Sequence, residues 1–246
     1  MKPSTRLSLG WTLPSRKGAS RGMSDTGEHF QQIYRRRFTQ AGMEAKAAIW
    51  KVLVESFFQR WVKPNDIVLD LGCGFGEFLT HLQCARKIGV DLNEEPSGRL
   101  AQDIEFHAGD VCNLGFLADA GVNVVFTSNL MEHLPDKVAV EKMLSEARRV
   151  LAPGGHFIAM GPNLRYLPGR YWDFWDHLVP ITDSSLVEAL ELSGFNICDR
   201  IPRFMPYTTC SPMPQSPALV RWYLRLRPVW KLLGRQFLIR AVKAGG

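Results

Sequence analysis

Short apolar runs alternate with amphipathic segments along most of the chain. Clusters of β-branched and apolar residues predict seven strands, at 67–69, 88–90, 104–107, 123–127, 156–160, 195–199 and 236–242. Apolar residues at three- and four-residue intervals predict helices at 38–61, 77–83, 135–151 and 184–192. Gly194 stands where the last of these helices should end. This alternation predicts an α/β fold with a mostly parallel sheet that helices cover on both faces.

Two segments depart from this alternation. Residues 164–180 mix five aromatic side chains with polar ones. Because they follow a strand, we expect them to overhang the ligand-binding edge of the sheet as a substrate lid, although a loop that buries its own aromatics has the same composition. Residues 216–234 place aromatic and aliphatic residues on one helical stripe beside cations. That pattern is typical of a basic amphipathic helix on an anionic membrane, or of a helix packed on its own domain.

Length and composition favour one domain with appendages. The 246 residues are 46% hydrophobic, which suffices for one substantial core. No window reaches the run of about 18 apolar residues that a membrane-spanning helix needs. The net charge of +6 is unevenly placed, because residues 1–24 hold five cations and residues 200–246 hold nine, both without an acid. The remaining residues 25–199 therefore carry a net charge of −8, which excludes general anion binding by the whole chain.

The first 24 residues are rich in Ser, Gly, Pro, Lys and Arg, and we interpret them as a disordered basic leader before a domain over residues 25–246. Their apolar stretch is too short for a secretory signal. An organelle transit peptide and a true start at Met23 stay open as alternatives.

The five cysteines are scattered without CxxC spacing, so we expect reduced thiols in the cytoplasm and no metal site.

A glycine-rich loop follows the first predicted strand and precedes a helix. Its glycines are Gly72, Gly74 and Gly76, so the third lies two positions after the second. In a dinucleotide-binding fingerprint this separation is three. Asp70 and Glu77 flank the loop and would repel a pyrophosphate, whereas a cationic ligand without phosphate suits them better. Asp70 could instead cap the following helix.

The segment 68–78 resembles motif I of the class I S-adenosylmethionine-dependent methyltransferases, an acid followed by GxGxG. The resemblance covers about residues 60–200. It implies a Rossmann-like, seven-stranded, mostly parallel sheet whose last strand is antiparallel, with S-adenosylmethionine as the cofactor. Segments 131–135 and 149–155 resemble sequences of the small-molecule branch, the quinone-biosynthesis-like, type 11 methyltransferase domains.

The resemblance also assigns roles to single positions. It implies that Asp91, which ends the second strand, binds the ribose hydroxyls, that the acid of Asp110-Val111 contacts the adenine, and that Ser128-Asn129 line the methionine end. A solvated strand end is the alternative for Asp91. The expected cofactor-binding residues are Asp70, Gly72, Cys73, Gly74, Gly76, Asp91, Leu92, Asp110, Val111, Ser128 and Asn129.

Methyl transfer from a sulfonium is an in-line displacement, so positioning supplies much of the catalysis. If the acceptor is an oxygen, a base would help, and we expect His133 or His177 in that role, with Asp173 and Asp176 behind them. The segment 216–234 resembles insertions in methyltransferases of bacterial envelope-glycan pathways. We therefore expect a small-molecule or lipid-linked glycan acceptor. Peripheral membrane contact through 216–234 and packing of that segment on its own domain both stay open.

Three other functions stay open. The basic chain ends suggest an RNA methyltransferase, but Ser128-Asn129-Leu130-Met131 stands where amino-group base methylators have an Asn/Asp-Pro-Pro-aromatic motif, so we do not expect a nucleic-acid partner. A non-catalytic, cofactor-binding scaffold at the membrane is the second alternative. A nicotinamide dehydrogenase is the third and disagrees with the glycine spacing. The sequence predicts no oligomeric state.

Overall fold

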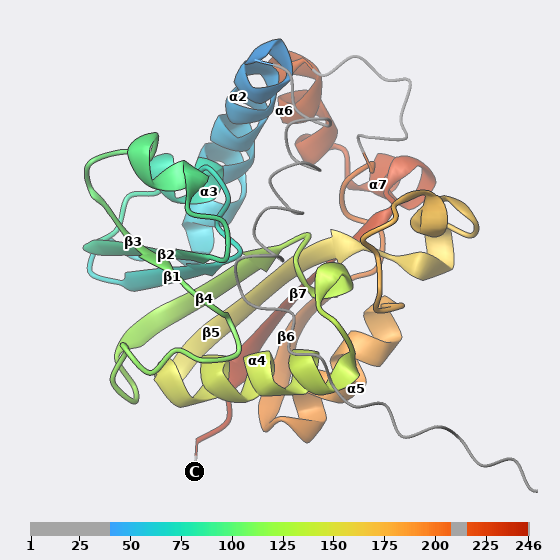
Figure 1. Cartoon of the computed structure of the whole chain (residues 1–246). Coiled ribbons are helices and arrows are strands. Elements are labelled where there is room, and N and C mark those ends of the chain that lie inside the picture. Colours follow the sequence, from blue (N-terminus) through green and yellow to red (C-terminus); the bar gives the residue numbers. More distant parts are fainter. Residues whose placement is uncertain (1–39, 208–215, 246) are drawn as a thin grey trace, which may run out of the picture.

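A computed structural model describes residues 40–207 and 216–245 of the chain. Seven strands form one sheet in the order β3-β2-β1-β4-β5-β7-β6 (Figure 1). All neighbouring strands are parallel except that β7 is antiparallel to β5 and β6. The strands are β1 (Ile67–Leu71), β2 (Arg86–Asp91), β3 (Ile104–Ala108), β4 (Val122–Ser128), β5 (Leu151–Pro162), β6 (Phe195–Ile201) and β7 (Gln236–Lys243). The seven predicted strands and the antiparallel last strand are confirmed.

Helices cover both faces of the sheet, as the alternation predicts. Figure 1 shows α4 and α5 on one face and α2, α3 and α6 on the other, with α6 beside α2. Two apolar clusters fill the space between these layers and the sheet. The helices are α2 (Gln40–Ser56), α3 (Glu77–Thr80), α4 (Lys137–Val150), α5 (Asp183–Leu192), α6 (Pro217–Arg225) and α7 (Arg227–Leu233). Short 3-10 helices are η1 (Phe58–Trp61), η2 (Glu95–Gly98), η3 (Met131–His133), η4 (Leu164–Tyr166) and η5 (Arg170–Asp173).

Local sequence signals account for the best-defined helix ends. Asp136 caps α4 by accepting a hydrogen bond from the Ala139 backbone N–H, at 2.8 Å. Thr182 and Ser185 form a reciprocal capping box at the start of α5. Gly194 follows α5 with φ +80° and donates its backbone N–H to Glu191, as expected of a glycine that ends a helix.

Three predicted helices differ in extent from those observed. The helix predicted at 77–83 is a single turn, because the chain tightens at Leu82, whose N–H bonds to Leu79 only three positions back. The helix predicted at 38–61 ends at Ser56 and continues as η1, and its first two residues lie outside the described part of the chain. The stripe at 216–234 forms two helices, α6 and α7, because Pro228 cannot lie inside one continuous helix. The leader at 1–24 lies outside the described residues.

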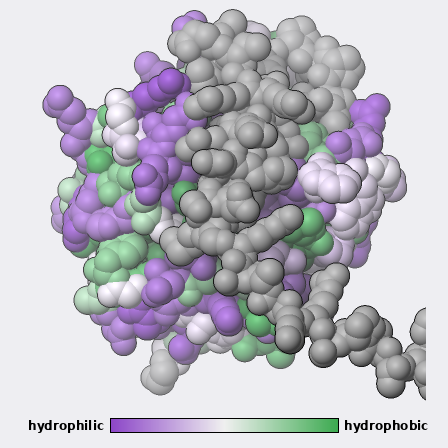
Figure 2. Space-filling view, viewed as in Figure 1, coloured by the Kyte–Doolittle hydropathy of each residue, from purple (hydrophilic) through white to green (hydrophobic). Residues whose placement is uncertain are grey.

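The visible surface is mostly polar. In Figure 2 hydrophilic residues are mixed with smaller apolar patches, and residues of intermediate hydropathy gather at the right, over the part of the chain that follows β5. Two exposed tryptophans belong to that part, Trp172 and Trp175. Within residues 40–207 and 216–245, no helix is long and apolar enough to cross a membrane.

Candidate functional site

A cavity of about 430 Å³ opens at the carboxyl ends of β1, β2 and β4. This volume lies in the range of sites for small ligands, and this edge of the sheet is where α/β folds bind them. The central wall comes from the loop between β1 and α3. Residues of α2, of the turn after β4 and of the segment before β7 complete it.

The glycine loop has a backbone that other residues adopt only with strain. Gly72 and Gly74 have φ values of +71° and +51°. A Cβ at Gly72 would lie 2.9 Å from the side chain of Leu130, so any larger residue at this position would also clash with Leu130. The backbone N–H groups of Gly72 and Cys73 both donate to the Val90 carbonyl, at 2.8 and 3.1 Å. These bonds fix the loop against the end of β2.

Asp91 lies at the end of β2 and faces the loop. One carboxylate oxygen accepts the Gly74 N–H at 2.8 Å, and the other accepts the Asn93 N–H at 2.9 Å. Burial raises the pKa of the Asp91 carboxyl, while those two backbone bonds work in the opposite direction. Each oxygen keeps a lone pair for a further donor, such as a ligand hydroxyl.

Negative charge is concentrated beside the loop. Asp70 is only 3% exposed, and its pKa lies well above the usual value because of burial and because of the neighbouring carboxylates of Glu77 and Asp91. Lys46 forms an ion pair with Glu77 at 2.8 Å and offsets part of this charge. The site therefore favours a cation, which would relieve the repulsion between the carboxylates, over a phosphate.

Aromatic rings form the apolar wall of the cavity. Phe78 and Phe126 stack with ring centroids 3.7 Å apart and an interplanar angle of 12°. Trp50 from α2 meets Phe126 edge to face, with centroids 6.0 Å apart. At the end of β4, Asn129 has a φ of +51° and donates its backbone N–H to Met160 at 3.0 Å. That conformation turns the chain across the carboxyl end of the sheet.

The structure gathers most of the expected cofactor-binding residues around one space. The cavity is lined by nine of them: Asp70, Gly72, Cys73, Gly74, Asp91, Leu92, Val111, Ser128 and Asn129. Gly76 and Asp110 are not among the lining residues. Gly76 precedes α3 with φ +72°, and a Cβ there would lie 2.5 Å from the Leu100 side chain. Asp110 is exposed, and its carboxylate accepts the Cys112 N–H at 2.9 Å.

The two candidate base residues lie side by side, but only His133 reaches the cavity wall. Its ring centroid is 4.9 Å from that of His177, which is 4% exposed. The His133 Nδ1 lies 3.0 Å from the backbone oxygen of Asp176 and 3.2 Å from its carboxylate. Burial alone would lower the pKa of His133, but the contacts with Asp176 and the charge of Glu132 outweigh it and raise the pKa. Of the two acids expected behind the histidines, Asp176 also lines the cavity.

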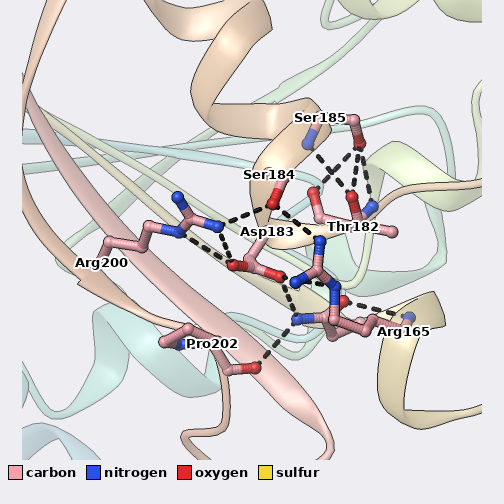
Figure 3. A network of polar contacts seen from close by, with 8 residues as sticks. Arg165, Thr182, Asp183, Ser184, Ser185, Arg200 and Pro202 are labelled. Atoms are coloured by element: carbon pink, nitrogen blue, oxygen red, sulfur yellow. Dashed lines mark hydrogen bonds and ion pairs between the residues drawn. The ribbon is translucent and has the colours of Figure 1, made fainter.

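The aromatic segment at 164–180 is tied down at both ends. The Leu164 N–H donates to Ile181 at 3.0 Å, which closes the segment into a loop. At its base, Asp183 is 1% exposed, accepts the Asn163 side-chain amide at 2.9 Å and forms an ion pair with Arg200 (Figure 3). Burial works to raise the pKa of Asp183, yet the hydrogen bonds from Asn163 and Arg200 dominate and lower it. The network joins the ends of the loop to α5 and β6.

The aromatic side chains of this segment have three different surroundings. Tyr171 is fully buried and donates its hydroxyl to the Val179 carbonyl. Phe174 lines the cavity, whereas Trp172 and Trp175 are 52% and 85% exposed. The segment therefore has both a small core of its own and a side chain at the site.

Several cavity residues carry no motif in the sequence. Lys46 and Trp50 lie on α2, whose apolar spacing indicates only a packed helix. Met205, Pro206 and Tyr207 come from the segment after β6, and Gln236 is the first residue of β7. The polar Gln236 at the start of an apolar strand is the one signal that could have indicated a site there.

The chain is similar to known methyltransferases in its family match, in its curated relatives and in its fold. Residues 69–159 match a family model described as a methyltransferase domain. A probable S-adenosylmethionine-dependent methyltransferase from Mycolicibacterium smegmatis is 33% identical over 141 residues, 54% of this chain and 53% of that protein. A demethylmenaquinone methyltransferase from Symbiobacterium thermophilum is 30% identical over 151 residues, 53% of this chain and 57% of that protein.

Solved structures share the fold. A SAM-dependent methyltransferase from Archaeoglobus fulgidus superposes with a TM-score of 0.61 at 22% identity, covering 87% of this chain and 99% of that one. The chain spans about half the length of the two curated relatives described above. The matched residues 69–159 include the glycine loop, Asp91 and the turn after β4.

Proposed function

We propose that this chain, which carries a class I S-adenosylmethionine-dependent methyltransferase domain, transfers the methyl group of that cofactor to an oxygen of a small-molecule or lipid-linked glycan acceptor. One observation carries the proposal: the glycine loop and the carboxyl groups of Asp70, Glu77 and Asp91 lie together at a cavity at the carboxyl edge of the sheet. S-adenosylmethionine supplies a methyl group on a positively charged sulfur. Its charge and its hydroxyls match what these residues accept.

The residues present fit this cofactor. Asp91 has a free lone pair on each carboxylate oxygen for the ribose hydroxyls. We assign the methionine end to the loop at Gly72–Gly74 and to Ser128 and Asn129, and the adenine end to Leu92 and Val111. Gly76 supports this site from outside by starting α3. Asp110 reaches the adenine only if its carboxylate leaves the Cys112 N–H.

We assign the acceptor to the part of the cavity bounded by His133, Phe174 and Tyr207. These residues lie after β4, in the aromatic segment and after β6, which places them together across the end of the sheet. Phe174 offers a ring against which a sugar face or an aromatic acceptor could pack. The aromatic segment acts as the lid of the site in this proposal, and its clamped ends hold Phe174 at the acceptor.

We further propose that α6 and α7 contact an anionic membrane surface. Leu219 and Trp222 on α6 are 42% and 58% exposed, and exposed Arg221 and Arg225 lie beside them. Exposed apolar side chains next to cations suit the interface of an anionic bilayer. A lipid-linked acceptor would be presented at such a surface, on the cytoplasmic side, where the unpaired cysteines of the described residues stay reduced.

The test is incubation of the full chain with S-adenosylmethionine carrying an isotopically labelled methyl group and with separate pools of extracted lipids, glycans, small phenols and RNA. We expect a labelled product from the lipid, glycan or phenol pools, with the methyl group on oxygen by mass spectrometry. Labelling of RNA alone, weakened by salt as phosphate contacts are, would contradict the proposed acceptor. Cofactor binding without turnover in any pool would favour the scaffold.

A further inference from the structure

Three side chains with metal-binding chemistry meet beside the cavity. Glu132 and His133 lie on η3 after β4, and His177 comes from the aromatic segment. One candidate ligand atom from each lies within 4.8 Å of the others. We propose that Glu132, His133 and His177 bind a divalent transition-metal ion, with zinc as the reference ion. The sequence alone predicts no metal site.

The ligand types suit such an ion. Two imidazoles and one carboxylate make a three-ligand set that zinc uses in catalytic sites, with the fourth position left open. Zinc–ligand bonds of about 2.0–2.2 Å place neighbouring ligand atoms about 3.4 Å apart. The widest separation in the cluster, up to 4.8 Å, would therefore contract by up to about 1.4 Å, which side-chain rotation can supply.

Glu132 gives the strongest indication of a cation-binding site. It is 2% exposed, and its Oε1 has no hydrogen-bond partner among the described residues. A buried oxygen left without a partner destabilises the fold, so its retention indicates that a ligand completes it.

His133 is already oriented as a metal ligand would be. Its Nδ1 is held by the backbone oxygen and the carboxylate of Asp176, at 3.0 and 3.2 Å. Its Nε2 consequently points toward Glu132, with Oε1 3.9 Å away. A carboxylate on one imidazole nitrogen and a metal on the other is the usual arrangement around ligating histidines.

The second histidine is held by packing. The His177 ring stacks on Phe174 with centroids 4.9 Å apart and lies 4.7 Å from the ring of Tyr171. The backbone oxygen of Glu132 accepts the N–H groups of Leu178 and Val179, at 2.7 and 3.1 Å. These bonds keep the aromatic segment against η3, so both parts of the metal site are in place.

The open coordination position would face the cavity. Glu132 and His177 are buried, and His133 lines the cavity wall. An ion among them would contact a group bound in the acceptor region. This consequence rests on the proposed function: the ion would lower the pKa of an acceptor hydroxyl, whose proton is lost to solvent. In that case the metal replaces the general base that the sequence analysis expects at His133 or His177.

The experiment uses untagged full chain stripped by a chelator and titrated with Zn²⁺ by calorimetry, and with Co²⁺ followed by visible absorption. The variants are Glu132→Gln, which keeps the shape and removes the charge, and His177→Gln. His107→Gln is the matched control, because His107 lies on β3 and pairs with Glu105 instead. Cooperative urea unfolding of each protein shows whether the variants are folded. S-adenosylmethionine binding is measured separately.

We expect one ion per chain, Co²⁺ absorption without a thiolate band, and at least about 100-fold weaker binding in Glu132→Gln and His177→Gln. His107→Gln should bind as the wild type does. Equal affinity in all four proteins, a thiolate band, or no binding by the wild type would overturn the proposal. Zinc binding in a chain that fails to bind S-adenosylmethionine would contradict the proposed function and leave the metal site standing.

Discussion

The Gly74 backbone N–H donates to the Asp91 carboxylate across 2.8 Å, joining the glycine loop to the end of β2. The bond couples two parts of the site that the sequence separates by seventeen positions. It orients the Asp91 carboxylate toward the cavity and holds the loop in its positive-φ conformation. Asp91 and the glycine loop are therefore held together as one structural unit.

Asp70→Asn should stabilise the protein without cofactor. The pKa of Asp70 is raised in the folded state, so the wild type loses stability as pH rises from the unfolded value of 3.8 through the folded value. Asparagine has no such loss. We expect the variant to be more stable than the wild type at neutral pH and equally stable at about pH 4, measured by urea unfolding.

The same substitution should weaken S-adenosylmethionine binding, because the bound cation would favour the ionised form of Asp70, which asparagine lacks. Asp103→Asn is a suitable control, since Asp103 is exposed and pairs with Lys87 away from the cavity. A variant that is less stable than the wild type at neutral pH would contradict the assigned electrostatics of Asp70.

Asp183→Asn should loosen the base of the aromatic segment. It removes the buried charge opposite Arg200, which we expect to cost about 2 kcal/mol because Arg200 itself is partly exposed. The pKa of Asp183 is lowered, so its contribution is present above the unfolded value and is lost only as pH falls through the folded one. The stability difference from the wild type should therefore stay constant between about pH 7 and pH 5.

Methyl transfer by Asp183→Asn should fall more than cofactor affinity does, because Phe174 loses its support while the glycine loop is untouched. Chemical unfolding, calorimetry and turnover on one preparation measure the three quantities. A variant with unchanged turnover, or with a stability difference that shrinks between about pH 7 and pH 5, would show that the network does not hold the segment in this way.

The double variant Leu219→Glu/Trp222→Glu should weaken membrane binding. Both side chains are exposed, so the fold should tolerate the change, while insertion of two charges into the interface is unfavourable. Sedimentation with phosphatidylglycerol vesicles should show at least about tenfold lower partitioning. Leu192→Glu is the control, since Leu192 is 84% exposed on α5, across the sheet. Equal partitioning of wild type and double variant would argue against α6 as the contact.

The sheet was predictable because parallel strands buried on both faces are short apolar runs. Val68 and Leu69, for example, are fully buried and belong to the apolar run that follows Asp66. The glycine loop was predictable because its backbone needs residues without a Cβ. The lengths of the helices were harder to predict. The residues after Thr80 have helical spacing, yet the turn before β2 ends the helix at Thr80.

The rest of the site depends on tertiary contacts that no local pattern encodes. Tyr207 and Gln236 reach the cavity from after β6 and from β7, far along the chain from the motifs. The approach of His177 to Glu132 likewise depends on how the aromatic segment folds back over η3. Pro228 can be read from the sequence, but only the structure shows that the amphipathic segment 216–234 forms two helices, α6 and α7, at that point.

Calorimetric titration of S-adenosylmethionine into wild type and Asp91→Ala tests the central claim most directly. In the proposed site Asp91 is the charged acceptor for the ribose hydroxyls, so we predict saturable 1:1 binding by the wild type and a loss of affinity of about 10- to 100-fold in the variant. Asp103→Ala, which removes an exposed carboxylate outside the site, should bind as the wild type does. Equal affinity in wild type and Asp91→Ala, or no binding by the wild type, would contradict the assignment of this cavity to the cofactor.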